Sequence, residues 1–358
     1  MENYYNIHNI VKIKIQTKKL DIVKDYEYYF RDFKVVEKIN NVDIEIRDID
    51  EFSLPKESFN ISNAFFGFDH GVYSKNDSYA VRIENNKMVI FLRESNLCIN
   101  SLIEYFLLRN DCTFIHGAGI SYKNKGIIFP APPNTGKTLL ISKLRQKENV
   151  NFFGDDYVIL KKDGTMYSYP MDFSVYDYHF DFFPELKGTI ENKKIKRNIY
   201  ERALVNMVKD LPIKKVLKRM ARFIGYDFLQ GGLYLKIPAQ QLVAKEKIGV
   251  STQIKYCIFL SRYNGKEFKV EKIKLENLVK ETLGILQSEW YKTLPVYNLL
   301  SSFGIIDFSE YLNSIKNIIS SGFSDMELFK ILIPTDMENK ERLQKIEKFL
   351  EQNVFNPE

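Results

Sequence analysis

The sequence is poor in the residues that build disulfide frameworks, zinc sites and membrane spans. Its 358 residues include three cysteines (Cys98, Cys112 and Cys257) without a Cys-x-x-Cys pair, and four histidines that form no cluster. This pattern argues against a zinc site and favours reduced thiols in a cytoplasmic protein. The N-terminus is polar and charged, so we expect no signal peptide. No apolar run approaches the ~20 residues that a membrane span needs, so we expect no membrane partner.

Alternation of apolar and polar residues predicts strands in the first quarter of the chain. It covers residues 11–15 and 42–46. Two further runs, 79–83 and 88–92, flank Glu-Asn-Asn-Lys, which predicts a hairpin turn. Aromatic residues make up 14% of the chain, which also favours β-rich packing. Residues 1–95 are therefore predicted to form a small β-rich domain.

The rest of the chain changes its periodicity several times. Helical spacing begins near residue 95 and ends near 109, and 254–260 is a continuous apolar run typical of a buried strand. Residues 275–349 are mostly helical in pattern, with a last strand predicted at 329–334 and a charged helix at 340–352.

A loop with the residue types of a phosphate-binding P-loop follows the apolar run 126–129 and precedes an apolar, helix-like segment. In this strand–loop–helix context, backbone N–H groups and the helix dipole favour an anion. We expect Lys137 to reach the terminal phosphates of ATP and Thr138 to bind Mg²⁺. The residues expected to contact the nucleotide are Ala131, Pro132, Pro133, Asn134, Thr135, Gly136, Lys137, Thr138 and Leu139.

This loop departs from the pattern G-x-x-x-x-G-K-[ST] at one position, because Ala131 stands where the first glycine belongs. Alanine does not adopt positive φ cheaply, so Ala131 must hold an ordinary backbone conformation or carry strain. The alternative interpretation of the segment is an ordinary turn between a strand and a helix.

Polar residues on both sides of the loop could complete a site. Downstream, Asp155 and Asp156 stand between two apolar runs, where carboxylates can hold Mg²⁺ or accept a proton. Adjacent side chains on an extended segment point to opposite sides, so the two acids should have different roles. Upstream, His116 lies among small residues on an apolar strand; it is either a packed core residue or a ligand or charge partner at the site.

These three motifs together resemble the nucleotide core shared by HPr kinase/phosphorylase and ATP-dependent phosphoenolpyruvate carboxykinase. The resemblance covers about residues 100–178 and is greatest to HPr-kinase-like proteins. It implies that Lys137 and Thr138 bind phosphates and Mg²⁺, that Asp155 is the base that deprotonates the acceptor hydroxyl, and that Asp156 contacts the metal. The carboxykinase counterpart of His116 is a metal ligand, so we count His116 among the catalytic candidates.

Two departures leave the acceptor open. The HPr kinase signature Pro-Val-x-Pro-Gly-Arg is absent, and nothing resembles the substrate-binding arginines of the carboxykinase. The resemblance implies an α/β fold with a P-loop nucleotide core, which we place over 96–275. The residue patterns add a β-rich N-terminal domain over 1–95 and a mostly helical region over 276–358 that could supply a homo-oligomer contact.

Within this core, residues 187–222 carry 12 lysines and arginines against 3 acids. The segment is either a solvated helical face or a basic patch for an acidic partner. Just before it, the segment 171–179 lies where the resembled family places residues near the acceptor, but His179 itself is expected on the surface.

The function predicted from these patterns is an ATP-dependent kinase that phosphorylates a hydroxyl group of a peptide or a small metabolite. Alternatives are a non-catalytic nucleotide-binding sensor, a nucleic-acid kinase that uses the basic 187–222 face, and a carboxykinase-type lyase. Nucleic acid ranks below a peptide or small anion as a partner, because no nucleic-acid module accompanies the basic segment.

Overall fold

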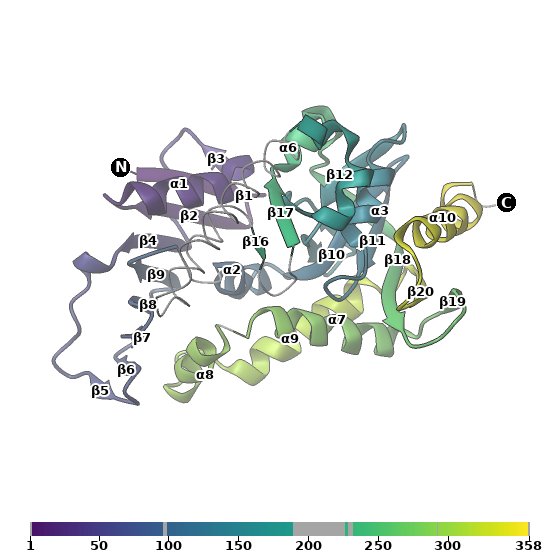
Figure 1. The fold of residues 1–358 in the computed structure, drawn as a ribbon. Coiled ribbons are helices and arrows are strands. Elements are labelled where there is room, and N and C mark those ends of the chain that lie inside the picture. Colours follow the sequence, from purple (N-terminus) through teal and green to yellow (C-terminus); the bar gives the residue numbers. More distant parts are fainter. Residues whose placement is uncertain (1, 96–98, 189–225, 228–231, 292, 357–358) are drawn as a thin grey trace, which may run out of the picture.

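The computed structural model shows a mixed α/β protein built around two large sheets (Figure 1). The structure describes residues 2–95, 99–188, 226–227, 232–291 and 293–356. Cys98 and nearly all of the basic segment 187–222 lie outside these residues. No helix in the described part is long and apolar enough to cross a membrane.

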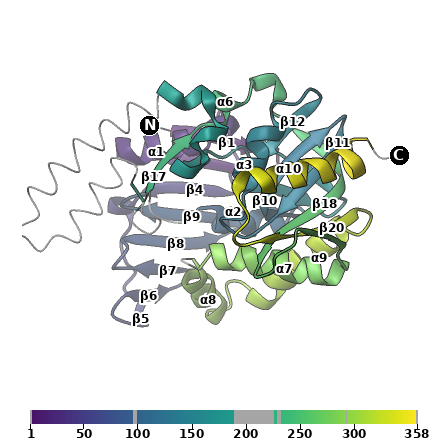
Figure 2. The same ribbon diagram turned by 45° about the vertical axis from the view of Figure 1, so that its right-hand side comes forward.

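The N-terminal sheet has nine strands in the order β3-β1-β2-β4-β9-β8-β7-β6-β5, seen stacked in Figure 2. Asn85 and Asn86, with φ of 49° and 64°, form the tight turn between β8 and β9. Asparagine adopts this left-handed conformation more readily than most residues, so the hairpin predicted here is confirmed. The strands are β1 (Glu2–Ile7), β2 (Val11–Gln16), β3 (Lys34–Val35), β4 (Ile44–Asp48), β5 (Phe59–Asn60), β6 (Phe65–Phe68), β7 (Gly71–Ser74), β8 (Tyr79–Glu84) and β9 (Lys87–Leu92).

The second sheet has the strand order β11-β10-β13-β14-β18-β20-β19, with β12 beside β10 and a further pairing of β11 with β18. Strand β11 runs parallel to β18, and β18 runs parallel to β20. The buried strands predicted at 254–260 and 329–334 lie inside β18 and β20. The strands are β10 (Cys112–Tyr122), β11 (Lys125–Pro130), β12 (Val150–Gly154), β13 (Tyr157–Lys161), β14 (Thr165–Tyr167), β18 (Ser251–Tyr263), β19 (Lys269–Lys272) and β20 (Glu327–Pro334).

Helices cover both faces of this second sheet. Successive residues of its strands point to opposite sides, so each face carries apolar side chains that a helix layer buries. Ile127 of β11 joins the apolar cluster of α3 (Lys137–Leu144) and α10 (Asn339–Leu350). Ile128, the next residue, joins the cluster of α7 (Leu275–Glu289), α8 (Leu294–Ser302) and α9 (Phe308–Gly322). The C-terminal region is thus mostly helical, but β20 and α10 are integral parts of the second sheet's core.

The two sheets share one apolar core. Helix α2 (Ile99–Leu108) packs against β2 of the first sheet and β10 of the second, and α8 contacts β7. In Figure 1, α7, α8 and α9 run along one side of both sheets. Relative placement of the sheets is therefore fixed by buried apolar contacts.

A small third sheet closes the space between the two halves. It has the order β15-β17-β16, from β15 (Phe173–Tyr176), β16 (Tyr226–Asp227) and β17 (Gly232–Ile237), and α6 (Ala239–Leu242) follows it. Helix α1 (Leu20–Tyr29) of the N-terminal part faces this region. Arg31, just after α1, forms an ion pair with Asp172 at 2.7 Å and donates to Gln240 at 3.0 Å.

Candidate functional site

The loop between β11 and α3 begins and ends with different backbone conformations. Ala131 is fully buried and is not among the residues with positive φ, so it holds an ordinary conformation and needs no glycine. Asn134 and Gly136 do adopt positive φ, at 62° and 103°. The φ of Gly136 favours glycine at this position, and a Cβ there would also lie 3.1 Å from Cζ of Arg342, so that side chain would have to shift.

The side chain of Lys137 is buried and satisfied within the loop. Its Nζ donates to the carbonyl oxygens of Ala131 at 2.9 Å and Pro132 at 3.2 Å, and lies 3.1 Å from Nε2 of His116. Burial lowers the pKa of Lys137. Burial and the adjacent ammonium together lower the pKa of His116 well below its ordinary value, so the neutral ring accepts at Nε2. His116 is thus a partner of Lys137.

The two acids occupy the break between β12 and β13, both of which pair with β10. Asp155 is fully buried, and its Oδ2 accepts a hydrogen bond of 2.7 Å from Oγ1 of Thr138. Its Oδ1 has no hydrogen-bond partner among the described residues. Burial raises the pKa of Asp155 to about 7, and the neighbouring Asp156 adds to this shift.

Asp156 is more accessible than Asp155 and has several charged neighbours. Its side chain is half-buried and lines a cavity in front of the loop. Burial raises the pKa of Asp156, while Lys137 and Lys236 oppose this shift. The two adjacent acids therefore occupy different environments, whereas the different roles expected for them stay a prediction.

The cavity has a volume of about 220 Å³ and collects residues from distant parts of the chain. Because α3 begins at Lys137, the N–H groups of its first turn lack carbonyl partners within the helix and border this space. The lining residues are His116, Pro133, Asn134, Thr135, Gly136, Lys137, Thr138, Asp156, Tyr157, Ser174, Tyr176, His179, Glu289 and Arg342.

Four of the predicted site residues do not line this cavity. Ala131 and Leu139 are fully buried in the apolar cluster beneath the loop. Pro132 contributes its carbonyl oxygen to Lys137 and accepts a 2.5 Å hydrogen bond from Oγ1 of Thr135. Asp155 lies behind Thr138. These four residues support the loop and the acid pair through packing and hydrogen bonds and do not face the cavity.

The prediction that His179 lies on the surface is wrong. Its side chain is only 5% exposed and lines the cavity, because the 3-10 turn Asp177–Phe182 folds it against the end of β15. Its Nδ1 accepts a hydrogen bond from the backbone N–H of Tyr176 at 3.3 Å. Burial and the charge of Arg342 lower the pKa of His179 to about 4, so the ring is neutral at physiological pH.

Two charged residues of the cavity had no motif in the sequence that could identify them. Glu289 is the last residue of α7, and burial raises its pKa. Arg342 is buried in the first turn of α10, and its Nη1 donates to the carbonyl oxygen of Thr135 at 3.0 Å. Both residues lie on amphipathic helices where a charge ordinarily faces solvent, so only the packing of α7 and α10 brings them to the loop.

The described residues contain no cluster of three or more histidines, cysteines and acids that would form a metal site by themselves. A Mg²⁺ ion that arrives with a nucleotide needs only one or two carboxylates, because phosphates and water supply the remaining ligands. The hydroxyl of Thr138 and the unpartnered Oδ1 of Asp155 fit this requirement.

No protein-family model matches this chain, and no curated protein matches it.

Proposed function

We propose that this chain is an ATP-dependent kinase that transfers the γ-phosphoryl group to a hydroxyl group of a small acceptor. The observation that carries the proposal is the arrangement around Thr138. Its hydroxyl lies 2.7 Å from the buried Asp155 at the start of α3, while Asp156, the next residue, opens on the cavity in front of the loop. The strand–loop–helix setting and the helix N-terminus favour phosphate groups in that cavity.

The geometry supports an exchange of the roles that the resemblance implied for the two acids. Asp155 accepts from the hydroxyl expected to bind Mg²⁺ and keeps an unpartnered Oδ1, so it is suited to hold the ion. Its side chain does not line the cavity, so it is unsuited to meet an acceptor. Asp156 is half-buried and lines the cavity, so its carboxylate can meet a bound hydroxyl. We therefore assign the base to Asp156, and metal binding to Thr138 and Asp155.

In the proposed reaction, the acceptor oxygen forms a bond to the γ-phosphorus while the bond from that phosphorus to the β–γ bridging oxygen breaks and ADP leaves. The hydroxyl proton passes to the carboxylate of Asp156. When bound, Mg²⁺ offsets the negative charge of the β- and γ-phosphates. Lys137 offers a second positive charge once its ammonium exchanges the carbonyls of Ala131 and Pro132 for a phosphate oxygen.

The roles of the two acids are tested by incubating wild type, Asp156→Asn and Asp155→Asn with Mg²⁺·ATP and a panel of hydroxyl compounds, and measuring phosphate transfer by mass spectrometry. We expect Asp156→Asn to bind ATP within twofold of wild type but to lose roughly 10²–10⁴-fold in turnover, the usual contribution of a general base. Asp155→Asn should require a higher Mg²⁺ concentration. Asp325→Asn, in the exposed turn before β20, is the control.

Full turnover by Asp156→Asn would show that Asp156 is not the base. ATP binding by wild type without transfer to any acceptor would favour the nucleotide-binding sensor. A protein that binds no ATP would refute the proposed function altogether.

A further inference from the structure

A second cavity borders the first one, because Asp156 and Ser174 line both. Its volume is about 320 Å³, and it is enclosed between α1 of the N-terminal part and the small third sheet. The lining residues are Asp25, Tyr26, Tyr28, Tyr29, Arg31, Ser95, Ile99, Asp156, Met171, Asp172, Ser174 and Lys236.

Asp156 is the group that both cavities share and that meets charges from each. Its carboxylate interacts electrostatically with Lys137, which lines the first cavity, and with Lys236 and Asp172, which line the second. A hydroxyl that reaches from the second cavity to this shared wall would lie beside the Asp156 carboxylate and face the cavity in front of the phosphate loop. In-line transfer requires the acceptor oxygen to approach the γ-phosphorus directly while the base lies at its side.

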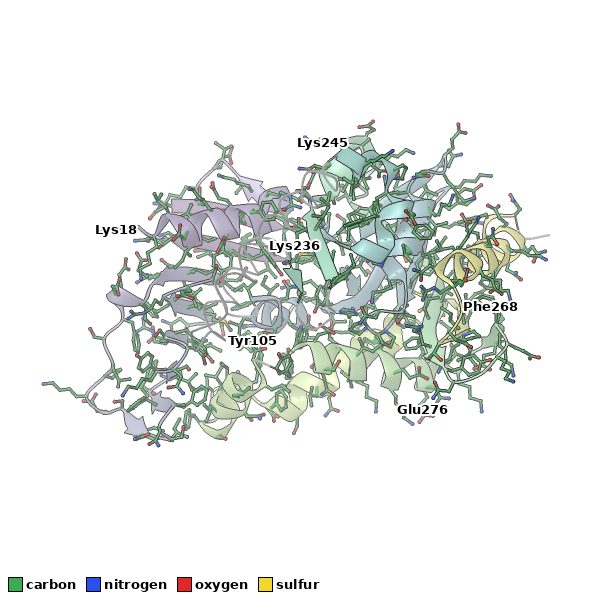
Figure 3. The ribbon with its side chains drawn as sticks, viewed as in Figure 1. Lys18, Tyr105, Lys236, Lys245, Phe268 and Glu276 are labelled. Atoms are coloured by element: carbon green, nitrogen blue, oxygen red, sulfur yellow. The ribbon has the colours of Figure 1, made fainter. Side chains whose placement is uncertain are left out.

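Most charges around the second cavity are already paired. Arg31 forms its ion pair with Asp172 and stacks over the ring of Tyr28 at 4.7 Å, and Asp25 accepts a hydrogen bond from Ser95. Lys236 is exposed and has no ion-pair partner within the part of the chain that the structure describes. Lys236, labelled in Figure 3, lies on β17 opposite Ser174 of β15, and Ser174 lines both cavities.

We infer that the second cavity binds the phosphoryl acceptor, and that this acceptor is a small hydroxyl compound with one carboxylate group, which Lys236 binds. Of the two cations that line this cavity, Arg31 is held by Asp172, so Lys236 can bind one carboxylate, whereas a phosphorylated ligand would require more positive charge. The aromatic rings of Tyr26, Tyr28 and Tyr29 provide the remaining wall, so a short carbon skeleton can pack between them. This inference rests on the proposed kinase function, because it uses Asp156 as the base.

The test compares acceptors that differ only in the carboxylate: glycerate with glycerol, and L-serine with L-serinamide. We expect wild type to phosphorylate the two carboxylate compounds with a KM at least tenfold lower than that of their neutral counterparts. Lys236→Gln should abolish this preference while leaving the Kd for ATP within twofold of wild type, and Lys236→Arg should retain the preference. Lys245→Gln is the control, since Lys245 is exposed and outside both cavities (Figure 3).

Three results would overturn the inference. The first is equal KM values for the members of each pair, and the second is an unchanged carboxylate preference in Lys236→Gln. The third is a wild type that binds ATP but neither phosphorylates glycerate or L-serine nor binds them in calorimetry with Mg²⁺·ADP present. In all three cases the nucleotide site would stand. Failure to bind ATP would instead refute the proposed function and this acceptor site together.

Discussion

Glu104 of α2 allows a quantitative test of how the two halves of the molecule are joined. The side chain has no exposed surface, and its carboxylate accepts hydrogen bonds from the hydroxyl of Thr113 and from the backbone N–H of Phe114 at 2.9 Å. Both partners belong to β10, the strand that also carries His116. Burial raises the pKa of Glu104 to about 8, because two hydrogen bonds do not replace the hydration that the charged form loses.

This shift has a defined sign. The folded protein keeps the Glu104 proton up to about pH 8, whereas the unfolded chain releases it near the ordinary glutamate pKa of 4.5. The stability contributed by protonated Glu104 is therefore complete below pH 4.5 and decreases as the pH rises toward 8. At 1.36 kcal/mol for each pH unit, ionisation of Glu104 lowers the free energy of unfolding by about 3 kcal/mol at pH 7 and about 4 kcal/mol at pH 8, relative to its value below pH 4.5.

The variant Glu104→Gln removes this cost, since an uncharged amide can accept from Phe114 and donate to Thr113. We expect the free energy of unfolding of the variant, relative to wild type, to increase with pH between 5 and 8 by about 3–4 kcal/mol. Urea denaturation at four pH values would measure it, with Glu57→Gln, an exposed loop glutamate, as the control. A pH-independent difference between Glu104→Gln and wild type would refute the reasoning.

Two further predictions concern the loop. Gly136→Ala should lower the free energy of unfolding by about 1–2 kcal/mol, because φ is 103° and the new methyl group meets Arg342. The control is Gly284→Ala in α7, where nothing lies within 4 Å of the added Cβ; it should raise the free energy of unfolding by about 0.5–1 kcal/mol. If calorimetric unfolding shows the same change for both variants, the conformation of the loop at Gly136 is wrong. Arg342→Met should raise the Kd for ATP several-fold by freeing the carbonyl oxygen of Thr135, and an unchanged Kd in isothermal titration would show that α10 does not hold the loop.

Local sequence patterns were sufficient for most individual elements. The turn residues between two apolar runs predicted the hairpin of β8 and β9, and continuous apolar runs predicted β18 and β20, because these signals depend on a few neighbouring residues. The strand, loop and helix from β11 through α3 were likewise predicted from local sequence, because glycine, lysine and threonine follow one another at the end of the loop between two apolar runs.

Tertiary structure decided which residues share a cavity. Glu289, Arg342 and His179 reach the phosphate loop from α7, α10 and the turn after β15, and their positions depend on packing across more than 40 residues of intervening chain. The different environments of the adjacent Asp155 and Asp156 also arise there, because burial and charge depend on neighbours that are distant in sequence. The sequence alone therefore determined the elements and the loop. Only the fold placed α1 opposite Asp156 and formed the second cavity.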